Sequence, residues 1–100
     1  MKVQFTSSAR NQFLSALSFI RRDKPSAAVS FRNRAETKLR RLENFLESGR
    51  TIPEFPEHPY REVIISPDRF FYKIKADIVW IVAVWHGAQI PINIEMTEPA

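Results

Sequence analysis

The sequence predicts an α+β domain in the order strand, helix, helix, strand, strand, strand, with a two-helix hairpin packed on an antiparallel sheet. Residues 6–48 contain two stretches with apolar residues at every third or fourth position, which is the helical period. Residues 60–87 contain three apolar runs separated by short polar joints, which is typical of consecutive antiparallel strands. Helices segregated from such a meander are expected to cover one sheet face.

The N-terminal elements follow from short-range patterns. Lys2 to Thr6 alternates in polarity and predicts a short first strand. The hydroxyls of Thr6, Ser7 and Ser8 suit the N-cap of a helix that should end near Arg21-Arg22. The apolar positions of this helix are Ala9, Phe13, Leu17 and Ile20.

The second helix is expected to begin at Pro25, which fits a first helical turn, and to end at Ser48 before a C′ glycine, Gly49. It would exceed twenty residues and would be packed on one side only. Its apolar positions are Ala28, Phe31, Ala35, Leu39, Leu42 and Phe45 or Leu46, and its opposite face carries Arg32, Arg34, Lys38, Arg40 and Arg41.

The later half of the chain contains a linker, two turns and a central strand. Three prolines exclude a helix or a central strand from residues 51–59. Residues 66–68 and 76–77 are predicted turns, and Ile78 to Trp85 is apolar on both faces, as expected of a central strand. We expect one domain over residues 1–100, with residues 92–100 as a loose C-terminal tail.

Composition excludes several classes of protein. There is no Cys, and His58 and His86 cannot form a metal site alone, so no metal or cofactor is expected. Nucleophile elbows and phosphate-binding glycine loops are absent, and Glu54 and Glu57 are expected to be solvated rather than a catalytic pair. With no signal-like N-terminus and no apolar run of ~20 residues, a soluble cytoplasmic protein without a membrane partner is the natural expectation.

Charge is distributed unevenly. Residues 21–50 contain nine Lys/Arg and four Asp/Glu, a net +5, whereas residues 51–100 contain four and seven, a net −3. A basic helical half suits an acidic partner or nucleic acid, although a solvated helix face has the same composition.

The strands carry a basic and aromatic series. By alternation, Arg69, Phe71, Lys73 and Lys75 share one face, and Phe70, Tyr72 and Ile74 share the other. Phe70 and Ile74 are the better core residues, so the basic series should point away from the helices onto an open face. Such a face would suit RNA, and the outer strand would suit a partner peptide. Trp80 and Trp85 are expected in the core, and His86 is either structural or a proton-exchanging group.

Residues 2–91 resemble the RelE/ParE superfamily of small bacterial toxins. The resemblance is carried by Val3-x-Phe5-Thr6-x-x-Ala9, Tyr60-Arg61-Glu62, Arg69-Phe70-Phe71-Tyr72 and Ile81-Val82-Ala83-Val84-Trp85-His86-Gly87. It implies the toxin of a type II toxin-antitoxin module, of the kind linked to plasmid stabilisation. Such a toxin is neutralised by a cognate acidic antitoxin in a hetero-oligomer.

The superfamily contains two modes of action. RelE-type members cut mRNA on the ribosome, and Arg69 matches an arginine of that group, but Gly87-Ala88-Gln89 stands where further basic residues are expected. ParE-type members bind DNA gyrase without chemistry, and Arg61-Glu62 and His86-Gly87 look more like that branch. Ala88-Gln89 departs from that branch too, which often has more basic character after this His.

The ParE branch is favoured. The alternatives are a RelE-type endoribonuclease, a diverged inactive member and, in another class, a basic nucleic-acid-binding domain without toxicity.

Two sets of site residues follow. The catalytic candidates for an RNase are Arg69, Lys73 and His86. The expected contacts to a target or antitoxin are Arg61, Arg69, Tyr72, Lys73, His86, Arg34, Lys38 and Arg41.

Overall fold

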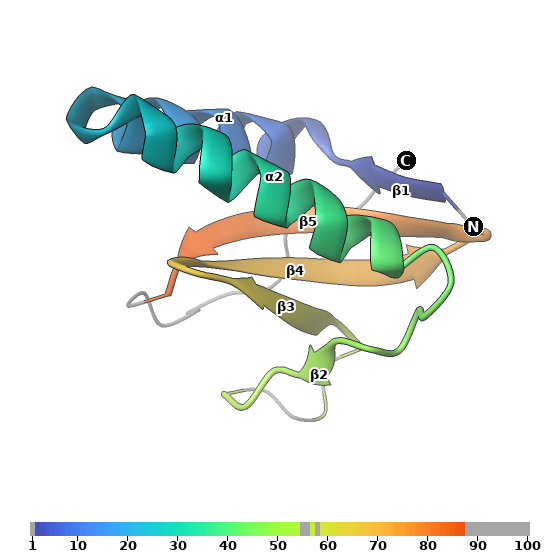
Figure 1. Cartoon of the computed structure of the whole chain (residues 1–100). Helices are drawn as coiled ribbons and strands as arrows, with labels where there is room; N and C mark the ends of the chain where they lie inside the picture. The colour runs from blue at the N-terminus through green and yellow to red at the C-terminus, as the bar shows by residue number, and fades with distance from the viewer. Residues whose placement is uncertain (1, 55–56, 58, 88–100) are drawn as a thin grey trace.

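A helix pair covers one face of a five-stranded sheet in the computed structural model, which describes residues 2–54, 57 and 59–87 (Figure 1). The elements are β1 (Lys2–Phe5), α1 (Ser7–Asp23), α2 (Pro25–Arg41), β2 (Arg50–Thr51), β3 (Arg61–Ile65), β4 (Asp68–Lys75) and β5 (Ile78–His86). The predicted α+β class and the helix hairpin over the sheet are confirmed. The expected tail, residues 92–100, lies outside the described residues.

The strands are ordered β1-β5-β4-β3-β2. The meander of β3, β4 and β5 is antiparallel, as predicted. β1 departs from the antiparallel expectation because it pairs parallel to β5, with Lys2 opposite Ile78 and Phe5 opposite Ile81. The return path between parallel neighbours must be long, and here it contains both helices.

Both helices begin as their sequences predict. The Ala9 amide donates to Thr6 Oγ1 at 3.1 Å, which makes Thr6 the N-cap of α1. Pro25 occupies the first turn of α2.

The predicted end of α2 at Ser48 is wrong, because the helix stops after 17 residues at Arg41. The next amides bond three residues back, Leu42 to Leu39 at 3.0 Å and Asn44 to Arg41 at 3.2 Å, which tightens the chain out of the α-helix. Apolar spacing continues through this segment, and it therefore imitates a longer helix.

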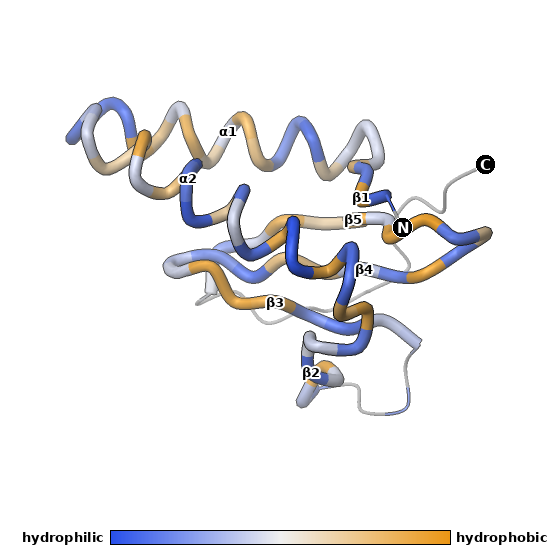
Figure 2. Tube along the Cα trace, turned by 45° about the vertical axis from the view of Figure 1, so that its right-hand side comes forward, coloured by the Kyte–Doolittle hydropathy of each residue, from blue (hydrophilic) through white to orange (hydrophobic). Residues whose placement is uncertain are grey.

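The main core lies between the helices and the sheet. Phe13 of α1, Phe31 of α2 and Phe70 of β4 form a ring cluster with centroids 5.7–6.2 Å apart. Figure 2 shows hydrophilic and hydrophobic stretches alternating along both helices, as one-sided packing requires. Ile74, expected in this core, is exposed near the end of β4, next to the turn to β5.

A second, smaller core covers the opposite sheet face. Buried Ile52 and Tyr60, from the segment after β2, pack with residues of β4 and β5, namely Phe71, Val82 and Ala83. Trp80 and Trp85 are half-buried against this core, in line with prediction.

A β-bulge in β5 places two consecutive side chains on the face of the second core. Phe71 pairs with Ala83 and Tyr72 with Ile81, which leaves Val82 as an extra residue. Val82 and Ala83 therefore both face the second core. Ile52 and Tyr60 thus cover part of this sheet face, and the predicted open face is wrong over this area.

Candidate functional site

A buried ion-pair network joins the segment after β2 to β3 and β4. The Arg69 guanidinium donates through Nη1 and Nη2 to both oxygens of Glu54, at 2.9 and 2.8 Å. Its Nε donates to Glu62 Oε2 at 2.7 Å, and Arg50 Nε donates to Glu62 Oε1. The Arg69 side chain is 8% exposed and that of Glu62 is fully buried.

Electrostatics follow from this geometry. Hydrogen bonds from Arg69 hold the pKa of Glu54 below its usual value, and the carboxylates of Glu54 and Glu62 raise the pKa of Arg69. The Arg69 guanidinium also lies 5.2 Å from the centroid of the Phe71 ring. Arg69 is thus charged, paired on two sides and stacked on an aromatic ring.

Arg69 does face away from the helices, as alternation predicts, but it is not on an open surface. Glu54, expected to be solvated, is one of the groups that cover it. Sequence reasoning missed Glu54 and Glu62 as partners of Arg69. For Glu62 a signal was available, because the β3–β4 hairpin pairs Glu62 with Phe71, two residues from Arg69.

Tyr72 lies in the main core, although it was expected to contact a partner. Its hydroxyl donates to the Leu46 carbonyl at 2.7 Å and accepts from the Gly49 amide at 3.0 Å. Burial raises the pKa of the Tyr72 hydroxyl. Gly49 does not have a positive φ, and a Cβ there would lie 2.5 Å from Tyr72 Cε1. Gly49 therefore permits a close approach rather than a left-handed helix cap.

Two further candidates on the strands also contact their own fold. Arg61 is half-buried and donates from Nη1 to the Gly49 carbonyl at 2.9 Å. Lys73 Nζ lies 5.5 Å from the centroid of the Tyr60 ring. Arg61 therefore helps to hold the segment after α2 against the sheet, and Lys73 contacts Tyr60 of the second core.

The basic candidates on α2 remain exposed. Arg34 Nη1 donates to the Ser66 carbonyl at 2.9 Å, and Lys38 Nζ donates to the Ile64 carbonyl at 3.0 Å. Arg41, one turn further on, lines a hollow of about 340 Å³ between the end of α2 and β3. This row of cations follows the outer edge of β3.

His86 is exposed at the end of β5, paired in register with Asp68. Burial raises the pKa of Asp68, and the nearby His86 opposes that shift. His86 and Trp85 line a largely apolar groove of about 640 Å³ together with Phe19 of α1. Of the candidates on the strands, His86 is the most accessible.

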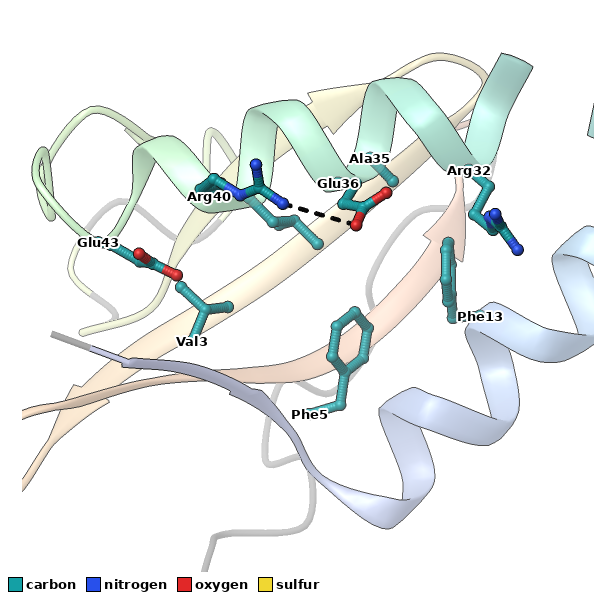
Figure 3. Close-up of a pocket in the computed structure, with 9 residues that line it drawn as sticks. Val3, Phe5, Phe13, Arg32, Ala35, Glu36, Arg40 and Glu43 are labelled. Atoms are coloured by element: carbon teal, nitrogen blue, oxygen red, sulfur yellow. Dashed lines mark ion pairs between the residues drawn. The ribbon is translucent and has the colours of Figure 1, made fainter. Parts of the chain in front are cut away.

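Another groove, of about 410 Å³, separates α2 from β1. Figure 3 shows Phe5 and Phe13 in this groove together with the charged side chains of Arg32, Glu36 and Arg40 of α2 and of Glu43 just beyond it. These charges are two arginines and two glutamates, with an Arg40–Glu36 pair at 3.6 Å, so the rim has no net charge.

The three RNase candidates do not converge. Lys73 lies four residues along β4 from Arg69, roughly 13 Å at ~3.3 Å per residue. His86 is at the strand end, opposite Asp68, and Arg69 is enclosed by carboxylates. Within the described part of the chain no group of three His, Asp or Glu side chains could hold a metal ion. Likewise, none of the described helices is long and apolar enough to cross a bilayer.

The sequence matches the family described as the ParE toxin of the type II toxin-antitoxin system, parDE, over residues 3–91. The chain belongs to the ParE toxin family. Among curated proteins no relative matches it. The resemblance to the RelE/ParE superfamily and its ParE branch is confirmed, and the chain is a toxin of the type II toxin-antitoxin class with an antitoxin as the implied partner.

Proposed function

We propose that this toxin inhibits growth by binding DNA gyrase, without cleaving RNA, and that a cognate acidic antitoxin neutralises it. The choice of gyrase binding over RNA cleavage rests on the enclosure of Arg69 by Glu54 and Glu62. An RNase of the RelE type needs a cation at the scissile phosphate and a proton-transfer group beside it. Releasing Arg69 would break buried ion pairs, at a cost of about 3–5 kcal/mol for losing a partner.

The exposed candidate residues support binding rather than chemistry. His86 lines an apolar groove with Trp85 and Phe19, which suits contact with a protein target. The cations of α2 and the net +5 of residues 21–50 suit an acidic antitoxin against the helix pair and the adjacent sheet edge.

The test begins with expression of the chain alone and together with the neighbouring antitoxin gene. Growth arrest in the first case and rescue in the second are expected. Purified toxin should inhibit gyrase supercoiling, and primer extension in a translating extract should show no codon-dependent cuts. Cuts that disappear in Arg69→Ala would assign the chain to the RelE-type RNases. Harmless expression, with no complex recovered from the operon, would remove the toxin function itself.

The variants must separate folding from contact. Arg61→Ala and Arg69→Ala are expected to reduce toxicity, chiefly because both side chains hold the fold together. Phe19→Ser changes an exposed side chain in the His86 groove, and Val29→Ser is its matched control on an exposed position of α2. Loss of gyrase inhibition in the first variant but not in the second would support the groove as the target contact.

A further inference from the structure

The outer edge of β3 is only partly covered by another strand. Within the described residues, β2 pairs with Arg61 and Glu62 alone, so the rest of β3, from Val63 to Ile65, has no strand partner on this edge. Carbonyls on one edge of a strand recur at every second residue. The Ile64 carbonyl therefore points outward, and the Ser66 carbonyl, in the turn that follows β3, also accepts a bond from α2.

Side chains of α2 occupy these carbonyls in place of a strand. Lys38 Nζ donates to Ile64 and Arg34 Nη1 donates to Ser66, at 3.0 and 2.9 Å. Lysines near an edge are a common protection against pairing with other chains. Both bonds are exposed, so water competes for the same groups and each bond contributes little to stability. An incoming strand can therefore replace them with its own amides.

We infer that the edge formed by Val63 to Ile65 of β3 and the Ser66 carbonyl that follows it binds an extended acidic peptide, which adds a strand there and places its carboxylates on the cations of α2. The spacing of the cations along α2 matches an extended peptide. Four residues of helix rise ~6 Å, so Arg34 and Lys38 are about as far apart as alternate side chains of a strand, at ~6.6 Å. Arg41 and Arg50 border the adjoining hollow and extend the basic row.

Binding would exchange one set of partners for another. The peptide amides take over the carbonyls of Ile64 and Ser66, and the released Lys38 and Arg34 pair with its carboxylates. Exposed Ile64 offers an apolar contact beside the new strand. The inference rests on the proposed function for the source of the peptide, the antitoxin, but the edge can be tested without it.

The probe is a synthetic octapeptide of alternating glutamate and valine, blocked at both ends, titrated into the isotope-labelled full-length chain. A glutamine-valine octapeptide is its control. We expect the acidic peptide to bind at least tenfold more tightly, and exchange of the Ile64 amide to slow on binding. Equal affinity for the two peptides, or chemical-shift changes confined to other parts of the sheet, would overturn the inference.

Matched variants separate backbone pairing from charge. Ile64→Pro removes the outward amide and should weaken binding at least tenfold, whereas Ile64→Thr should stay within about threefold. Lys38→Met should weaken binding about fivefold, and Lys24→Met, at the turn between the helices, should have no effect. Unchanged binding in Lys38→Met would contradict the charge exchange even if the proline variant does not fold.

The proposed function and the edge fail separately. If the chain arrests growth and its antitoxin restores growth, but the acidic peptide does not bind, the proposed function stands and the binding site on β3 is refuted. If the chain binds the peptide at Ile64 but is harmless on expression, the binding site stands and only the proposed function is refuted.

Discussion

Replacement of Glu62 by glutamine tests the buried network directly. The Glu62 side chain is fully buried and accepts from Arg50 and Arg69, so Glu62→Gln removes a charge that two guanidinium groups share. Losing one partner of a buried pair costs about 3–5 kcal/mol. We expect about 3 kcal/mol, the low end, because Arg69 keeps Glu54 and because Arg50 is 56% exposed and can be rehydrated.

Urea unfolding followed by circular dichroism measures this change. For a domain of 100 residues, about 3 kcal/mol corresponds to a fall in melting temperature of roughly 12–24 °C. Arg50→Met is the control and should lose less than about 1 kcal/mol, because the Arg50 side chain is 56% exposed and the buried Glu62 carboxylate keeps its pair with Arg69. A Glu62→Gln loss below about 1 kcal/mol, with an unchanged urea dependence, would show that the network does not hold the linker on the sheet.

Other perturbations test separate features. Gly49→Ala should lower the free energy of unfolding by about 1–3 kcal/mol in urea unfolding, because its Cβ would lie 2.5 Å from Tyr72 Cε1. The pKa of the Tyr72 hydroxyl is raised in the folded state. Its contribution to the free energy of unfolding is therefore present below pH 10 and is lost as the pH rises through the folded pKa. Tyr72→Phe should lose less stability at alkaline pH than the wild type. Ala76→Asn with Asp77→Gly should raise the melting temperature by several degrees, about 1 kcal/mol, because both turn residues have positive φ, at 51° and 62°. His86→Gln should keep gyrase inhibition within a few-fold, and complete loss in a folded variant would contradict a role for His86 that needs only hydrogen bonding and bulk.

Local features were predictable from the sequence because their causes are local. The Thr6 cap, the Pro25 start, the strand meander and the 76–77 turn each depend on residues a few positions apart. The end of α2 was missed because the tightened turns keep a helical spacing of apolar residues.

The candidate site was less predictable because its partners are distant in the chain. Arg69 and Glu54 are fifteen residues apart, and one of them belongs to a linker with no regular structure at that point. Alternation placed Arg69 on the correct face, but nothing in a strand pattern indicates what covers that face. The sequence predicts a partner contact for Tyr72 for the same reason, since its bonds to Leu46 and Gly49 depend on how the segment after α2 folds back.

The extra residue in β5 makes this strand unusually tolerant of one change in length. Removing Val82 would leave Ile81 and Ala83 as neighbours opposite Tyr72 and Phe71, so every remaining pair and every remaining side-chain orientation would be retained. Removing Val84 instead would turn Trp85 from the second core toward the helices, because each residue lost inverts the side-chain phase beyond it. Among homologues of this toxin, a one-residue gap in the last strand is therefore expected at the bulge, where it costs a single valine contact and leaves both cores in place.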